Sequence, residues 1–134
     1  MIILKRFFIF CALFFCGCSN KIILNCSGVN NYSILGEKHV DDVFIFEGGK
    51  IVSFRRVIKY SLNSDVDSKF AYKALKLEGK ALKKYIGGKY RISDNVNMIF
   101  SAKGFDKLNY IGIDSSYGYD DIVNSYSNLG FECK

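Results

Sequence analysis

The chain has 134 residues and carries 19 Lys and Arg against 13 Asp and Glu, a formal net charge of +6. Lys5 and Arg6 lie in the first 17 residues, so the 117 residues from position 18 onward have an excess of only four cations. This mild excess argues against a nucleic-acid-binding protein, which gathers many more cations on one surface. A chain of this length forms one domain and can bury a core of its own.

The N-terminus has the three parts of a secretory signal. Lys5 and Arg6 form a short basic region, residues 7–15 are apolar without interruption, and the small residue Gly17 follows. The apolar run is too short for a transmembrane helix, which needs about 20 apolar residues. We therefore predict that residues 1–17 are a cleaved signal peptide and that the rest of the chain is exported.

The segment FCGC at residues 15–18 resembles the bacterial lipoprotein signal, in which a small residue precedes the cysteine that receives the lipid. Gly17 and Cys18 match this pattern, whereas Phe15 and Cys16 stand where the family prefers Leu and a small residue. The resemblance implies that Cys18 is lipidated and anchors the chain through residues 18–21. Two or three acyl chains hold a protein on a membrane almost permanently. The alternative is an ordinary cleaved signal before a secreted protein.

The resemblance also bears on location. A lipidated chain is expected in the cell envelope, on the extracytoplasmic side of a membrane. Ser19, which follows the lipidated cysteine, is similar to an outer-membrane signal, so the periplasmic face of the outer membrane is expected if the source has two membranes.

Cys26 and Cys133 are the two cysteines that remain after Cys18. An even pair in an exported domain usually forms a disulfide. This bond would join the first strand of the domain to the penultimate residue and close a loop of nearly the whole domain. The alternative is two unpaired thiols.

Residues 22–134 are predicted to form a single α+β domain. Strands followed by a helix, then strands and a second helix, favour an antiparallel sheet of hairpins with one long and one short helix on one face. A bulge is expected near Arg55 and Arg56. In chain order we expect a strand at 21–28, a hairpin at 42–62 around Gly48–Gly49, a helix at 64–88, a hairpin at 89–104, a short strand at 108–114, and a helix with a final strand at 119–134.

The long helix carries two regular patterns. Apolar residues three and four positions apart are expected to face the sheet: Phe70, Ala74, Leu77, Ala81 and Tyr85. A row of lysines with the same spacing is expected beside them: Lys69, Lys73, Lys76, Lys80 and Lys83. Such a row is usually a solvated helix face. The functional alternative is contact with anionic lipid or an acidic envelope polymer, at about 1 kcal/mol for each cation near a charged membrane.

No pattern typical of a catalytic, cofactor or metal site is found. The single histidine, His39, lies near Asp41 and Asp42, but a zinc site needs three or four ligands, so we expect a solvated loop before a strand. The two glycine pairs lack the spacing of a phosphate-binding loop. The acidic segment 114–121 lacks the pattern of a calcium loop and is better explained as a helix start. We therefore expect a protein that is not an enzyme.

Several short patterns resemble the YehR-like family of small bacterial lipoproteins. They are LNCSG at 24–28, the glycine-lysine hairpin turn, the long helix, and NLGFECK at 128–134. The resemblance covers the whole chain after the signal. It implies an α+β domain with a disulfide between Cys26 and Cys133, and it implies no biochemical activity.

The expected function is therefore a membrane-anchored binding or structural module whose ligand and protein partner are not specified. The alternative is an inhibitor, immunity or superinfection-exclusion lipoprotein that blocks a toxin, a phage component or a cell-wall hydrolase. An aromatic segment displayed at residues 113–121 would favour this alternative.

Overall fold

The computed structural model describes residues 21–103, 108–114 and 116–134. These residues form six strands, two α-helices and one 3₁₀ helix. In chain order they are β1 (Lys21–Ser33), β2 (Gly36–Glu47), β3 (Lys50–Leu62), α2 (Ser68–Tyr85), β4 (Lys89–Ser93), β5 (Asn97–Lys103), the 3₁₀ helix η1 (Leu108–Ile111), α3 (Tyr119–Asn128) and β6 (Glu132–Cys133).

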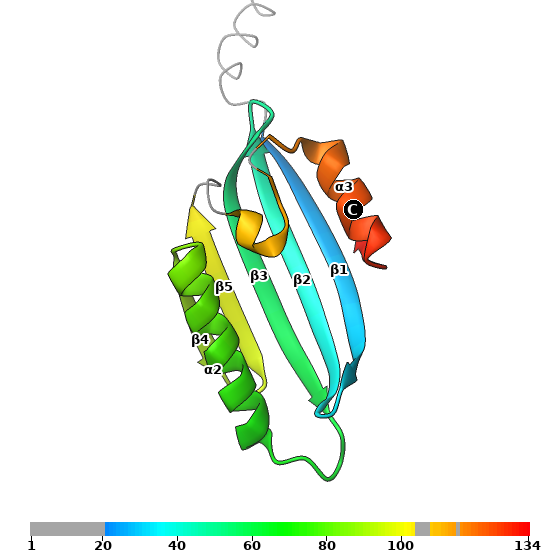
Figure 1. The fold of residues 1–134 in the computed structure, drawn as a ribbon, viewed down its shortest axis with the longest axis vertical. Coiled ribbons are helices and arrows are strands. Elements are labelled where there is room, and N and C mark those ends of the chain that lie inside the picture. The colour runs from blue at the N-terminus through cyan, green and yellow to red at the C-terminus, as the bar shows by residue number, and fades with distance from the viewer. Residues whose placement is uncertain (1–20, 104–107, 115) are drawn as a thin grey trace, which may run out of the picture.

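The six strands form one sheet in the order β4-β5-β3-β2-β1-β6, and all neighbouring strands are antiparallel. Both α-helices and η1 lie on the same face of this sheet (Figure 1). Helix α2 packs over β4, β5 and β3, and α3 packs over β1 and β6. The prediction of an α+β fold built on an antiparallel sheet is confirmed.

Two of the three hairpin turns of the sheet contain two residues with positive φ. In the turn between β2 and β3 these are Gly48 and Gly49, with φ of 61° and 82°. In the turn between β4 and β5 they are Asp94 and Asn95, with φ of 53° and 63°. The two-residue turn between Glu47 and Lys50 needs positive φ at both positions, which Gly, Asn and Asp adopt most easily. The predicted turn at the glycine pair is therefore confirmed.

The core lies between the sheet and the helices. Alternate residues of β2 are buried there, and the same alternation holds in β5. In β3 the register shifts between Ile45 and Phe46 of the partner strand, so that Ile51 and Phe54, three positions apart, are both buried. All buried apolar residues of the described part lie between Leu24 and Tyr126, so a chain that starts at Ser19 contains this whole core.

Three local predictions are wrong. The bulge lies beside the hairpin turn rather than near Arg55 and Arg56, because an extra residue is needed where Ile51 and Phe54 both enter the core. The segment that contains His39 is part of β2 rather than a loop, since β1 and β2 pair almost to their shared turn. Residues 108–111 form η1 instead of a strand.

The predicted buried face of α2 is also wrong, by one position. The helix buries Ala71, Leu75, Gly79 and Leu82, whereas Leu77 is 71% exposed and Phe70 and Tyr85 are about half exposed. At Gly79 a Cβ atom would lie 2.5 Å from the ring of Tyr90 in β4. The helix therefore approaches the sheet through its smaller residues, because phenylalanines of the strands already fill much of the core.

Candidate functional site

The face of the sheet opposite the helices is not covered by any other element of the described part. Successive side chains of a strand point to opposite faces, so the residues between the buried ones point here. They include several apolar side chains that are partly or mainly exposed: Ile23, Val43, Ile45, Val57 and Ile99. We call this surface the open face.

A groove of about 780 Å³ crosses the open face. Its apolar side is formed by Ile23 of β1 and by Val43 and Ile45 of β2. Its basic side is formed by Arg55 of β3, Lys89 of β4 and Lys103 of β5, and Ser53 and Ser101 also line this side. We call this site the open-face groove. Its volume lies within the range of small-molecule binding sites, about 300–1,000 Å³.

The strand register explains how the groove separates its apolar and basic sides. One row across the sheet runs Lys103, Ser53, Ile45, Ile23, and the next runs Lys89, Ser101, Arg55, Val43. The three cations therefore occupy two neighbouring rows, which lie two residues or about 7 Å apart along the strands. Among the described residues, no Asp or Glu lines the groove and none of the three cations forms an ion pair. The basic side is therefore available to an external anion.

His39 lies in a second, smaller depression of the open face, of about 370 Å³. Its Nε2 lies 3.4 Å from both Ser61 Oγ and Glu37 Oε1. A catalytic triad needs the serine and the carboxylate on different nitrogens of the imidazole, so this arrangement cannot relay a proton. No group of three or more potential metal ligands is found among the described residues.

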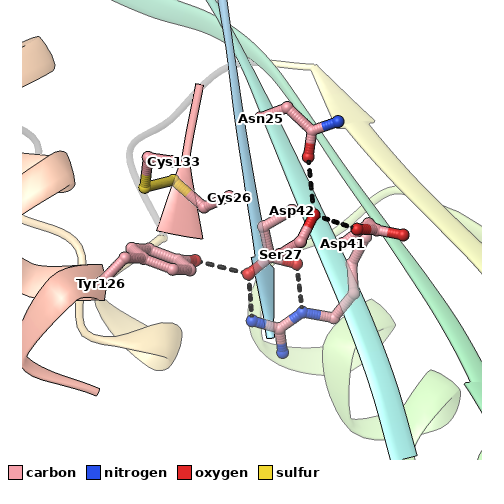
Figure 2. Close-up of a disulfide and its surroundings, with 8 residues drawn as sticks. Asn25, Cys26, Ser27, Asp41, Asp42, Tyr126 and Cys133 are labelled. Atoms are coloured by element: carbon pink, nitrogen blue, oxygen red, sulfur yellow. Dashed lines mark hydrogen bonds and ion pairs between the residues drawn. A yellow bond between two sulfur atoms is a disulfide. The ribbon is translucent and has the colours of Figure 1, made fainter. Parts of the chain in front are cut away.

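A partly buried cluster of charged residues lies between the sheet and the helices. Asp42 of β2 is fully buried and accepts two hydrogen bonds of 2.7 Å from Arg56 of β3. It also accepts a hydrogen bond from the hydroxyl of Tyr126 in α3, close to the disulfide (Figure 2). Glu78 of α2 lies 3.9 Å from Arg56 and 2.7 Å from Lys38 Nζ. The cluster thus connects both helices to the central strands.

The two residues that donate hydrogen bonds to Asp42, Arg56 and Tyr126, have shifted pKa values. Burial raises the pKa of Tyr126, and the negative charge of Asp42 raises it further. Burial by itself lowers the pKa of Arg56, but the hydrogen bonds and charge of Asp42 outweigh it, so the pKa lies above its ordinary value. Tyr126 stays neutral and Arg56 charged, which is the state that pairs with a buried carboxylate.

Sequence reasoning missed this cluster. It treated Asp42 as a solvated neighbour of His39, although Asp42 shares the alternation of Phe44 and Phe46. That shared alternation was the sequence signal that Asp42 points into the core. The two partners of Asp42 follow it by 14 and 84 positions, so no short motif marks them.

The predicted site residues lie in different parts of the molecule. Cys18 lies outside the described residues. Cys26 and Cys133 face each other in β1 and β6 and form a disulfide, as predicted. No helix of the described part is long and apolar enough to span a membrane.

The lysine row of α2 is exposed and lies on the helix side of the molecule, away from the open face. At 100° per residue it lies roughly 120° around the helix from the buried residues, so it points outward rather than along the edge of the core. Aromatic rings accompany it: Lys69 Nζ lies 5.7 Å from the ring of Phe70, and Lys76 Nζ lies 6.0 Å from that of Tyr72. The outer surface of α2 is therefore both basic and aromatic.

Comparisons of this chain with protein-family models, with curated proteins and with solved structures find no match.

Proposed function

We propose that this protein is an exported lipoprotein, anchored at Cys18, that uses the open face of its sheet as a non-enzymatic binding surface in the cell envelope. The observation that carries the binding role is the open-face groove, whose three cations have no ionic partner in the described structure. The disulfide supports export, because such bonds persist in oxidising compartments. The resemblance to YehR-like lipoproteins supports the anchor, and Ser19 supports an outer-membrane location if the source has two membranes.

The inhibitor alternative has weaker support. It depends on displayed aromatic side chains in residues 113–121, but Tyr117 packs against the core, and the ring of Tyr119, which is 39% exposed, lies 6.0 Å from that of Phe46. Asp121 accepts a hydrogen bond from the backbone of Gly118 at the start of α3. These residues are engaged in packing and capping, so the open-face groove is the better candidate for binding.

The anchor gives the first prediction. Cells that express the full chain should incorporate labelled palmitate into the protein, and Cys18→Ala should abolish the label and leave an uncleaved or mislocalised precursor. Cys16→Ala is the matched control and should be labelled normally. Equal labelling of the Cys18→Ala variant and the unmodified chain would contradict the anchor.

The outer surface of α2 is a second contact surface in this proposal, for anionic lipid head groups or an acidic envelope polymer. The exposed rings of Phe70 and Tyr72 beside the lysine row favour it, because cations and aromatic side chains together suit a membrane interface. The lysine row requires a negatively charged ligand.

The second prediction tests this surface. The unlipidated domain, residues 19–134, should bind anionic vesicles, and changing Lys73, Lys76 and Lys80 to Gln should weaken binding at least tenfold, since each cation contributes about 1 kcal/mol near a charged membrane. Binding is measured by vesicle sedimentation, and added salt should weaken it. A control variant loses three charges elsewhere, at Lys21, Lys50 and Lys59. Equal weakening of the two variants would show attraction by net charge rather than by α2.

A further inference from the structure

We propose that the open-face groove binds one acyl chain with an anionic head group, taken from the adjacent membrane as a long-chain carboxylate or phosphate. The acyl chain lies over Ile23, Val43 and Ile45, and the head group is held by the cations on the opposite side of the groove: Arg55, Lys89 and Lys103. This inference deepens the proposed function and relies on it for the position of the groove near a membrane.

The layout of the groove selects an amphiphile. The row from Lys103 to Ile23 crosses four strands, a distance of roughly 14 Å at the usual strand spacing. Over that distance the lining changes from cationic to apolar. A neutral lipid would leave three cations without a partner, and a free inorganic anion would leave the apolar side exposed to water. A ligand with charge at one end and an acyl chain at the other satisfies both sides.

The backbone at the rim helps to place the basic side. Gly88, directly before Lys89, has a φ of +88°, and a Cβ atom there would lie 2.2 Å from the carbonyl oxygen of Ser101. Only glycine combines this conformation with such a close approach. The glycine therefore brings the start of β4 against β5, where Lys89 lines the groove together with Arg55 and Lys103.

The position of the groove along the chain points to a membrane source for the ligand. Ile23 is five residues after Cys18, and an extended chain spans at most about 3.6 Å per residue, so the two lie within roughly 18 Å. If Cys18 is anchored, the groove lies close to the membrane surface. Membranes contain anionic lipids, so acyl chains with anionic heads would lie within reach of the groove.

The experiment titrates the domain 19–134, with its disulfide intact, with dodecanoate below its micelle concentration and measures heat by calorimetry. Dodecanoate should bind with one-to-one stoichiometry. Monolauroylglycerol, which has the same chain and a neutral head, should bind at least tenfold more weakly. Butyrate, which has the same head and almost no chain, should not bind.

Two triple variants with the same loss of charge form the decisive comparison. Changing Arg55, Lys89 and Lys103 to Gln should weaken dodecanoate binding at least tenfold. Changing Lys73, Lys76 and Lys80 to Gln, on the outer surface of α2, should leave the affinity within twofold. A further variant, Ile45→Asp, places a like charge on the apolar side and should also weaken binding at least tenfold. Circular dichroism checks that each variant is folded.

Three outcomes would overturn the proposal: no dodecanoate binding by the unmodified domain, equal binding of the neutral analogue, or equal weakening in both triple variants. Concentration-dependent dimerisation that Ile45→Asp abolishes, without dodecanoate binding, would assign the groove to a second copy of the chain instead. Palmitate labelling at Cys18 is read separately. Labelling without dodecanoate binding would reject this inference and leave the anchor intact.

Discussion

Reduction of the disulfide between Cys26 and Cys133 is expected to lower the free energy of unfolding by about 3–5 kcal/mol. The two cysteines are 107 residues apart, and in the chain-entropy model a closed loop of about 100 residues contributes about 4.7 kcal/mol. The bond also holds β6, a strand of two residues whose one neighbour among the described strands is β1. Urea unfolding of the domain 19–134 with and without dithiothreitol measures the difference.

The control for this experiment is the double variant Cys26→Ala with Cys133→Ala. Its stability should be close to that of the reduced domain and should not respond to dithiothreitol. A difference below 1 kcal/mol between the oxidised and reduced domains would contradict the prediction. It would mean that the packing of α3 holds the C-terminal segment without the bond.

Replacement of Arg56 by Met is expected to destabilise the domain by about 3–5 kcal/mol. Removal of one partner from a buried ion pair leaves the other charge uncompensated. Such changes typically cost about 3–5 kcal/mol. Asp42 is fully buried, and Arg56 supplies two of its hydrogen bonds. Urea unfolding of the variant gives the free energy.

Two further variants separate charge from packing. Arg55→Met changes the same residue type one position earlier, on the exposed face, and should cost less than about 0.5 kcal/mol. The double variant Asp42→Leu with Arg56→Met removes both charges and should be at least about 2 kcal/mol more stable than Arg56→Met alone, because an apolar pair of similar size often replaces a buried ion pair without loss. Additive destabilisation in the double variant would refute the role given to the buried charge.

Local sequence patterns predicted much of this fold correctly. The turn at Gly48–Gly49 follows from glycine's freedom to adopt positive φ. The long helix follows from its apolar spacing and its glycine stop, and the disulfide follows from the number of cysteines left in a chain that is predicted to be exported. Each of these features depends on nearby residues or on composition, so it can be recognised before the chain is folded.

The tertiary structure decided the features that matter most for function. The helix pattern predicted a buried face one residue away from the observed one, and the close contact of Gly79 with Tyr90 belongs to the face that is actually buried. The burial of Asp42 depends on Arg56 and Tyr126, which come from another strand and a distant helix.

The open-face groove also depends on contacts between elements that are far apart in the sequence. It exists because the strand order β4-β5-β3-β2-β1 brings Lys89 and Lys103 across the sheet from Ile23, which precedes them by more than 60 residues. Single-sequence patterns report periodicity within one element. They carry no information on which elements become neighbours, and the binding surface proposed here is made entirely of such long-range neighbours.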